Sequence, residues 1–565
     1  PGGHGIYDFI HREAETYFPY LSISRTEDPR RAVTVGNWVI PLSGGKVELL
    51  RRGPTFWEIL NQHGIPATVY KVPANFPPVD CESWSIAGLG TPDIIGTYGT
   101  FSYFTEEPPE GWQDFSGGKV YPVKMERHSF RASLIGPRNT YRVGSPKSEV
   151  GFTVHRDPAN AVARISIQGK VLLLQQGEWS DWVRVRFAMV PHLEHVSGIC
   201  RFYLKQVHPT FSLYVTPINV DPADPAMPIS TPSSYSRELC EEVGPFSTLG
   251  FPADTKALSN GLFTDEEYLD LADFILAERI SHFEYELERF REGFLFFYFS
   301  NVDQDTHMMW RTMDPRHPLH DPNASLRVKN GIRRYYEGVD AAVRMAMGKV
   351  DADTTLCIVS DHGFAPFYRE FNVNSWLLEN GYLALLDPSR RAETEFLNNV
   401  DWMGTRAYAL GLNSVYINRA DREAEGIVLP EEADALVGEM AARLEGVVDP
   451  VTGQRALAHV YKGREAYSGP HANSAPDLVM GYNWGYRVSD DSALGELPEE
   501  LFKNREDKWS GDHCIDPPLV PGVLISNKEI VLPNPSLSDL APTILREFGV
   551  RVPPEMTGRP LFDRG

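Results

Sequence analysis

Three short groups of aspartate and histidine residues lie far apart in the sequence, each beside a stretch that is predicted to be a strand. The groups are Asp303 with His307, Asp361 with His362, and His513. Apolar runs at residues 294–302 and 354–359 precede the first two groups, and the run 522–526 follows the third. Open α/β sheets bind their ligands at the carboxyl ends of the strands. The pattern therefore predicts one metal centre assembled from three distant segments.

Asp303 and His307 are four residues apart, so on a helical turn both side chains point the same way. A carboxylate and an imidazole on one face form a common zinc-binding pair. Alternatively, the two residues only cap the next helix, with Asp303 as its N-cap. Considered alone, the pair favours the capping interpretation, because short Asp/His pairs are frequent.

Asp361 and His362 are adjacent, and neighbours in an extended strand point to opposite faces. One ion could not easily take both side chains, whereas two ions could, or a turn at Gly363 could redirect them. Alone, this pair also fits a strand-end turn, and His513 alone fits a solvated or hydrogen-bonded residue. Three such groups at strand ends are not expected to be three independent caps. Two ions about 4 Å apart suit the cleavage of phosphate esters.

The order Asp-x-x-x-His, Asp-His-Gly and Gly-x-His resembles the alkaline phosphatase superfamily, nearest its type I phosphodiesterase/nucleotide pyrophosphatase branch. It is especially similar to bacterial predicted phosphohydrolase/phosphomutase proteins. Residues 1–9 resemble the segment shortly after that family's nucleophile, and residues 540–545, 553–556 and 558–561 resemble its C-terminal ending. The resemblance covers both ends of the chain and the core between them.

The resemblance implies roles for all five residues. Asp303, His307 and His513 would hold one zinc ion, and Asp361 and His362 would help to hold a second. The family's nucleophilic Thr or Ser, and a further Asp on the first strand, precede the segment that matches Pro1. We therefore expect the catalytic nucleophile before Pro1, and the N-terminus to be incomplete. Cytoplasmic and exported locations both stay open, because a missing beginning would hide a signal peptide.

Two positions depart from the patterns of related proteins. Nucleotide pyrophosphatases carry an Asn shortly after His-Gly-Ile, where this chain has residues 7–9, Tyr-Asp-Phe. Candidate replacements for binding an anion are His11, Arg12, Lys256 and Arg311; each fits a surface or ion-paired residue better, so none is included in the site. Phe364 after Asp-His-Gly argues against cofactor-independent phosphoglycerate mutase, and the histidine-rich set favours zinc over calcium.

Alternating apolar strands and helices predict an α/β fold of the alkaline phosphatase type, with a mostly parallel sheet and helices on both faces. Short alternating strands between residues 119 and 236 predict an inserted antiparallel β domain. Residues 1–118 and 237–565 are then the two parts of the α/β core.

Composition limits the classes of partner. The 565 residues carry a formal charge of -22, which argues against an overall attraction to nucleic acid or to an anionic membrane. No window approaches the roughly 18 apolar residues of a transmembrane helix. The five cysteines are scattered and form no Cys-x-x-Cys, so no zinc ribbon or disulfide framework is implied. A homo-oligomer is left open.

We expect a phosphoric ester hydrolase that acts on a small phosphorylated substrate, with phosphodiesters favoured over phosphomonoesters. It would use two divalent metal ions, with zinc favoured. Its nucleophile would be a Thr or Ser that is not among these 565 residues. Two alternatives use the same fold: a phosphomutase or phosphotransferase, and a non-catalytic scaffold or binding protein. Fold alone does not separate them.

Overall fold

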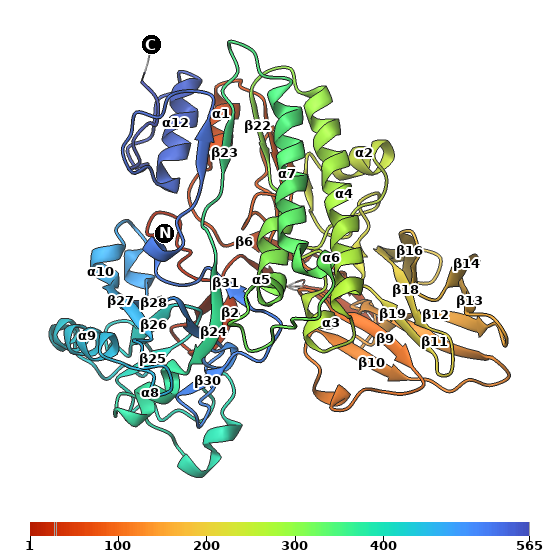
Figure 1. Ribbon diagram of the computed structural model, residues 1–565, viewed down its shortest axis with the longest axis horizontal. Helices are drawn as coiled ribbons and strands as arrows, with labels where there is room; N and C mark the ends of the chain where they lie inside the picture. The colour runs from red at the N-terminus through yellow and green to blue at the C-terminus, as the bar shows by residue number, and fades with distance from the viewer. Residues whose placement is uncertain (28, 30, 564–565) are drawn as a thin grey trace. The chain divides into compact units, whose positions relative to one another are not determined.

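A computed structural model describes residues 1–27, 29 and 31–563 of the chain. Helices and strands occur throughout, so the prediction of a mixed α/β fold is confirmed (Figure 1). The chain divides into two compact units. The first consists of Pro1–Ile23, Leu50–Leu60 and Asn301–Gly565, and the second of Ser24–Leu49 and Asn61–Ser300. The predicted division at residues 118 and 236 stays a prediction.

The second unit is rich in strands. They are β3 (Ser24–Glu27), β4 (Ala32–Val35), β5 (Trp38–Pro41), β6 (Lys46–Leu49), β7 (Ala67–Tyr70), β8 (Trp84–Ile86), β9 (Phe101–Thr105), β10 (Gly118–Pro122), β11 (Ser129–Arg138), β12 (Lys147–Arg156), β13 (Val162–Ile167), β14 (Lys170–Gln175), β15 (Glu178–Trp179), β16 (Val183–Val190), β17 (Glu194–Cys200), β18 (Phe202–Gln206), β19 (Ser212–Val215), β20 (Asn219–Val220), β21 (Ser230–Thr231) and β22 (Phe294–Phe297). Its helices are α2 (Tyr235–Glu242), α3 (Thr255–Ser259), α4 (Asp265–Arg289) and the 3₁₀ helix η1 (Trp112–Asp114).

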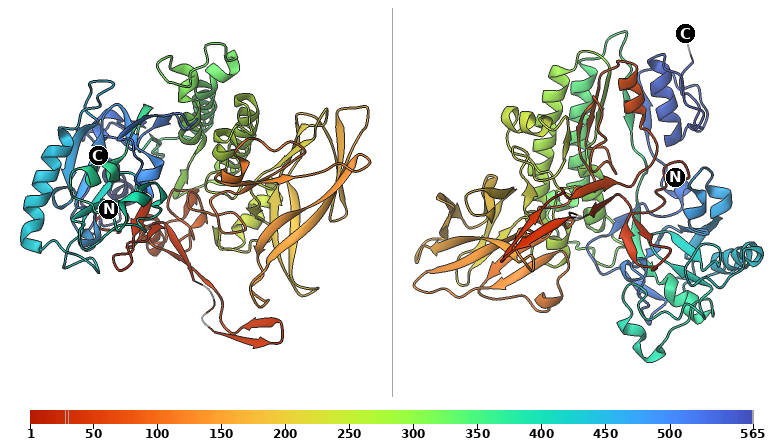
Figure 2. Two further views of the ribbon diagram at one scale, coloured as in Figure 1. Left: turned by 90° about the horizontal axis from the view of Figure 1, so that it is seen from below. Right: turned by 180° about the vertical axis from the view of Figure 1, so that it is seen from behind.

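Antiparallel sheets build most of this unit. One has the order β11-β12-β13-β14, another β16-β17-β20, and the hairpin of β4 and β5 is drawn in red in the left view of Figure 2. On β12 the buried residues are Ser148, Val150, Phe152 and Val154, every second position. This alternation lets one face of the sheet pack into an apolar core.

A separate sheet in the same unit has the order β21-β8-β7-β22, in which β7 runs parallel to both β8 and β22. Helix α4 precedes β22, and its start follows a local signal. Thr264 accepts a hydrogen bond from the backbone N–H of Glu267, whose side chain in turn accepts one from Thr264. This capping box is the local signal that starts the helix at Asp265.

The first unit contains the other elements. Its strands are β1 (Ile10–Arg12), β2 (Pro19–Leu21), β23 (Cys357–Val359), β24 (Ala365–Phe371), β25 (Ala407–Ala409), β26 (Ser414–Ile417), β27 (Leu457–Lys462), β28 (Leu478–Tyr482), β29 (Gly485–Val488), β30 (Phe502–Asn504), β31 (Gly511–Asp512) and β32 (Leu524–Ser526). Its helices are α1 (Phe56–Gln62, at the boundary of the units), α5 (Asn301–Met313), α6 (Leu326–Lys329), α7 (Gly331–Met347), α8 (Val373–Glu379), α9 (Pro430–Glu445), α10 (Gly463–Ala466), α11 (Asp490–Ala493), α12 (Leu540–Glu547), and the 3₁₀ helices η2 (Pro388–Glu393), η3 (Ala472–Ser474), η4 (Pro517–Leu519) and η5 (Leu537–Asp539).

Strand β24 is the centre of the first unit's packing near the candidate site. It pairs with β29 in parallel and with β30 and β31 in antiparallel fashion. A second sheet has the order β25-β26-β28-β27. Phe371, Leu377, Tyr408, Val415 and Leu436 belong to the apolar core that holds these elements together.

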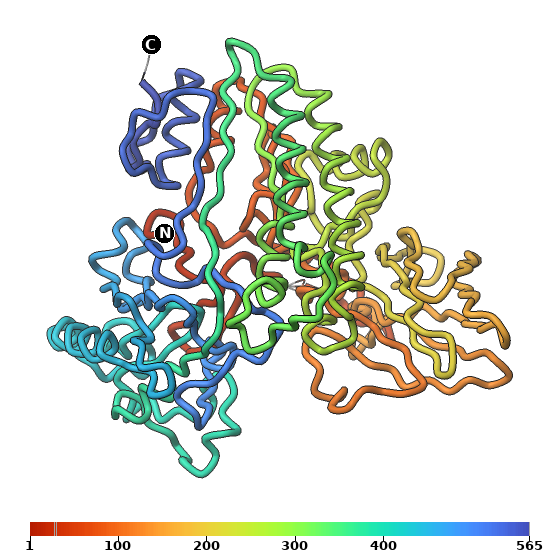
Figure 3. The backbone as a smooth tube through the Cα atoms, viewed as in Figure 1, coloured from red at the N-terminus to blue at the C-terminus, as the bar shows by residue number. Residues whose placement is uncertain are grey.

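Two expectations about strands are wrong. Residues 354–359 were expected to form a buried strand, but β23 covers only three residues and Val359 is 40% exposed. Its pairing strand is β32, which is antiparallel, and the two backbones run side by side in Figure 3. The run 294–302 is strand only to Phe297, because helix α5 already begins at Asn301. An apolar run predicts a strand, but its length and burial depend on which neighbours pack against it.

In the part of the chain that the structure describes, no helix combines the length and the apolar character that crossing a membrane requires.

A buried ion pair ties the N-terminal segment to the first unit's core. Arg12 Nη2 lies 2.6 Å from Glu423 Oε1, and the two side chains are 5% and 0% exposed. Arg422 Nε contacts the same carboxylate at 2.8 Å. Because both arginines are buried, loss of the carboxylate charge would leave poorly compensated charges away from water.

We expect the substitution Glu423→Gln to lower the free energy of unfolding by about 3–5 kcal/mol, the typical cost of breaking a buried pair. Urea unfolding of the full chain measures this. Glu393→Gln is the control, since Glu393 pairs with Arg390 on the surface, at 65% and 60% exposure. That change should cost less than about 1 kcal/mol. Equal losses in the two variants would contradict the prediction.

His317 should make stability depend on pH. Burial lowers its pKa to about 4, and its ring is hydrogen-bonded through Nδ1 to the N–H of Leu319 and through Nε2 to the carbonyl of Phe367. Between pH 6.5 and 4 the unfolded chain binds a proton here that the native state does not. This histidine therefore destabilises the native state as pH falls through that window, by about 3 kcal/mol in full.

The test is the urea midpoint of wild type and His317→Gln at pH 7 and pH 4.5. The wild type should lose more stability between the two pH values than the variant, which has one titrating histidine fewer. Parallel losses in the two proteins would show that His317 does not contribute to the pH dependence.

Candidate metal centre

The first turns of α5 carry Asp303 and His307. They lie one helical turn apart, as predicted, with His307 Nε2 3.5 Å from Asp303 Oδ1. His307 is almost fully buried, and its Nδ1 lies 2.7 Å from the carbonyl oxygen of Gly511. That acceptor assigns the ring proton to Nδ1, so the lone pair of Nε2 is directed at Asp303.

The segment 510–513 brings His513 to the same place. Ser510 N–H donates to the carbonyl of His307 at 2.7 Å, which docks this segment on α5. Gly511 permits the close approach, because a Cβ there would lie 2.9 Å from Trp310 Cβ and 3.1 Å from the carbonyl oxygen of Thr306. His513 Nε2 is then 3.4 Å from Asp303 Oδ1.

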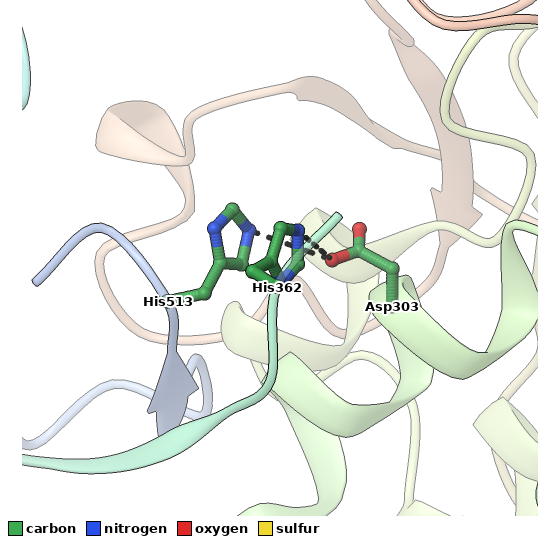
Figure 4. Close-up of side chains that lie close together, drawn as sticks. All are labelled: Asp303, His362 and His513. Atoms are coloured by element: carbon green, nitrogen blue, oxygen red, sulfur yellow. Dashed lines mark ion pairs between the residues drawn. The ribbon is translucent and has the colours of Figure 1, made fainter. Parts of the chain in front are cut away.

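His362 completes the cluster from the loop after β23. Its ring stacks on that of His513 with a centroid distance of 3.4 Å, and its Nε2 lies 3.8 Å from Asp303 Oδ1. Figure 4 shows the two rings side by side, with both directed at Asp303. Asp361 is more exposed, at 54% of its side chain, and its Oδ2 lies 3.5 Å from His362 Nε2.

Asp303 Oδ1 is the point on which the three imidazoles converge. This oxygen is buried and has no hydrogen-bond partner. A zinc ion holds nitrogen and oxygen ligands at about 2.0–2.2 Å, so the ligand atoms of a tetrahedral site are about 3.3 Å apart. The distances of 3.4 to 3.8 Å between Asp303 Oδ1 and the three Nε2 atoms are close to this spacing. Asp303, His362 and His513, whose ligand atoms also lie within 4.8 Å of one another, therefore fit a metal ion.

Protonation states also favour ligation. Burial lowers the pKa of His513 to about 3, so its imidazole is neutral at pH 7. Burial alone would raise the pKa of Asp303, but His307, His513 and His362 outweigh it and hold this pKa below its usual value. A neutral imidazole and an ionised carboxylate are the forms that bind metal ions.

Aromatic side chains surround the imidazoles. Phe364 lies edge-on to His307, His513 and His362, with ring centroids 4.8, 5.3 and 5.5 Å away. Trp509 stacks on His307 at 3.9 Å. Tight packing of this kind restricts the rotamers of the rings and so the directions of their nitrogen atoms.

All five predicted residues thus lie close together. Asp303, His362 and His513 form the set whose ligand atoms are all within 4.8 Å of one another. His307 contacts Asp303 outside that set. The assignment of His307 to the first ion and of His362 to the second stays a prediction.

Sequence reasoning missed the residues behind the cluster. No sequence pattern points to Trp509 or Arg487. Asp512 lies inside the Gly-Asp-His motif, but the motif predicts a role only for its histidine, His513. The residues near the N-terminus have structural contacts instead of an open anion site. Asp8 is partly buried and accepts hydrogen bonds from Asn413 N–H and the Ser414 hydroxyl, and His11 Nε2 accepts the N–H of Tyr7 at 3.1 Å.

A family model described as type I phosphodiesterase / nucleotide pyrophosphatase matches residues 200–513. This span is more than half of the 565 residues and contains all five predicted ligands. The chain belongs to this family. The predicted membership of the nucleotide pyrophosphatase/phosphodiesterase branch of the alkaline phosphatase superfamily is confirmed. Proteins of the family typically depend on metal ions, in keeping with the cluster at Asp303.

Two solved structures are similar to the chain over half of its length. They are murine ectonucleotide pyrophosphatase/phosphodiesterase 5, with 14% identity and a TM-score of 0.28, and its human counterpart, with 13% identity and a TM-score of 0.26. The matched region spans 60% of the length of each. A comparison with curated proteins gives no match.

We expect Asp303→Asn to weaken Zn²⁺ binding by more than about 100-fold, because replacing even residues outside the ligand set typically costs 10- to 100-fold. Competition with a chromophoric chelator measures the affinity. Asp340→Asn is the control, since Asp340 lies on α7 in a surface pair with Arg344 and is 72% exposed. Unchanged zinc affinity in Asp303→Asn would remove this carboxylate from the site.

Proposed function

We propose that the protein is a metal-dependent hydrolase of phosphate esters, and that it cleaves diesters better than monoesters. The observation that carries the proposal is the convergence of three imidazoles on the buried, unpartnered Oδ1 of Asp303. The ligands come from segments that the family match spans. Divalent ions held by such a cluster would supply the local positive charge that a chain with a net charge of -22 needs to bind phosphate.

In this proposal Asp303, His307 and His513 hold one ion, and Asp361 and His362 help to hold a second. Zinc is the proposed metal, because imidazole and carboxylate ligands at this spacing suit it. When bound, the two ions lower the pKa of an attacking oxygen and stabilise the leaving oxygen. The more exposed position of Asp361 puts this carboxylate on the solvent side of the cluster, where a substrate arrives.

The proposed nucleophile is a Thr or Ser hydroxyl. In the family pattern it belongs to the segment that precedes the stretch matching Pro1. Its oxygen would attack phosphorus in line and displace the first alcohol, and water would then hydrolyse the phosphoenzyme. His307 Nδ1 and His362 Nδ1 donate to backbone carbonyls at 2.7 and 2.9 Å, which keeps both rings oriented during the two steps.

The proposal includes the fold that positions this chemistry. It assigns residues 1–118 and 237–565 to a mostly parallel α/β core of the alkaline phosphatase type with helices on both faces, and residues 119–236 to an inserted β domain. The parallel pairing of β7 with β8 and β22 supports the first part. The antiparallel sheets of β11 to β14 and of β16, β17 and β20 support the second.

The test is hydrolysis of bis(4-nitrophenyl) phosphate and 4-nitrophenyl phosphate by the full-length protein with Zn²⁺. We expect the diester to be the better substrate, and Asp361→Ala or His513→Ala to lower kcat/KM by about 100-fold or more. His459→Ala is the matched control, because this histidine is 60% exposed and pairs with Asp516. Full activity in His513→Ala would overturn the proposal. Transfer of the phosphoryl group to an added alcohol, without release of phosphate, would indicate a phosphotransferase instead.

A further inference from the structure

Directly behind the cluster of candidate ligands lies a third carboxylate, that of Asp512. This residue is 2% exposed and ends strand β31, where it pairs with Ala365 of β24. It immediately precedes His513 in the sequence. Its proximity to His513 and Cys514 makes these three residues a candidate ligand group of their own.

Four hydrogen bonds already occupy the two oxygens of Asp512. Oδ1 accepts the backbone N–H groups of His513 and Cys514, both at 2.8 Å. Oδ2 accepts the indole N–H of Trp509 and Nη1 of Arg487, again both at 2.8 Å. A carboxylate has about four lone-pair positions, so this one has no capacity left for an ion. Asp512 is therefore bound to the protein and not available as a metal ligand.

Two of these hydrogen bonds position imidazole rings: the bond from His513 N–H to Oδ1 of Asp512, and the bond from the indole N–H of Trp509 to Oδ2 of the same carboxylate. The backbone bond sets the position of His513, whose Nε2 is 3.4 Å from Asp303 Oδ1. The indole bond sets the plane of Trp509, which stacks on His307 at 3.9 Å with 27° between the rings. His307 also donates to the carbonyl of Gly511, the residue before Asp512. One carboxylate thus orients histidines from two distant segments.

The ion pair with Arg487 requires a carboxylate, and not an amide, at position 512. Its side chain is 6% exposed and lies between Asp512, at 2.8 Å, and Asp490, at 3.2 Å. Asp490 is 54% exposed, so solvent screens its interaction with Arg487. The side chain of Asp512 is only 3% exposed, so Asp512 is the buried one of the two acidic partners of Arg487. An amide at position 512 would present N–H groups to Arg487 or Trp509, both of which are donors.

We propose that Asp512 is a positioning residue of the metal centre, which holds His513 through its backbone and His307 through Trp509. This inference rests on the proposed function, because it assigns a role toward the metal ions of that site. Asp512 touches neither the substrate nor the ions. Its effect reaches them only through the directions of the two imidazoles.

The experiment compares Asp512→Asn with Asp490→Asn in the full-length protein. The second variant removes the exposed partner of the same arginine and leaves Asp512 intact. For each protein, Zn²⁺ affinity is measured by chelator competition, the d–d absorption spectrum with Co²⁺ in place of zinc, and thermal unfolding without metal. We expect Asp512→Asn to weaken Zn²⁺ binding by about 10- to 100-fold and to change the Co²⁺ spectrum, while Asp490→Asn stays within about twofold of wild type.

A purely structural role for Asp512 would lower the stability of the metal-free protein and leave the Co²⁺ spectrum as in wild type, which overturns the inference. Unchanged zinc affinity in a folded Asp512→Asn also overturns it. If Asp512→Asn does not fold, the variant Trp509→Phe tests the positioning role instead. It keeps an aromatic ring over His307 and loses only the N–H that donates to Asp512. This variant should show weaker zinc binding and an altered Co²⁺ spectrum, and wild-type values would refute the role.

Failure of the inference can be distinguished from failure of the proposed function by His513→Ala. If His513→Ala binds zinc as tightly as wild type, the metal site itself is wrongly assigned, and the role of Asp512 falls with it. If His513→Ala loses zinc while Asp512→Asn and Trp509→Phe keep it, only the positioning role is refuted.

Discussion

A buried carboxylate oxygen without a hydrogen bond is the constraint on which the candidate site depends. Asp303 Oδ1 is in that position, and three imidazole nitrogens lie 3.4 to 3.8 Å from it. Leaving a buried charged acceptor unsatisfied costs about 1–3 kcal/mol or more. A divalent ion bound to this oxygen would remove the cost, because the ion would take the place of the missing hydrogen-bond donor. The surrounding packing holds Asp303, His362 and His513 with their ligand atoms within 4.8 Å of one another, as a shared ion requires.

Two segments must therefore be held in place around α5. The segment 510–513 docks on the helix through Ser510 and Gly511, and β31 ties the same segment to β24. The loop after β23 brings His362 onto His513. Phe364 fills the space between the rings, and its contacts with all three imidazoles mean that none of them can turn without disturbing the others.

Local signals predicted much of the helical structure and the pairing within each ligand group. The capping box at Thr264 and Glu267 starts α4, and Gly549, with a φ of 71°, follows the end of α12, where glycine is favoured. Strand burial was predicted less well. Residues 357–359 are apolar, yet Val359 is 40% exposed, because burial depends on what packs against a strand and composition alone does not supply that information.

The sequence by itself determined the kinds of ligand and the local geometry of Asp303 and His307, since a spacing of four residues puts two side chains on one face of any helix. It also predicted that Asp361, His362 and His513 belong with them. Only the tertiary structure showed that His362 stacks on His513 beside Asp303, and that Asp512 is saturated by four donors. The physical reason is the separation along the sequence over which each interaction acts. Helical periodicity acts over a few residues, whereas these contacts join segments whose distance is set by the pairing of β24 with β31 and by the docking of residues 510–513 on α5.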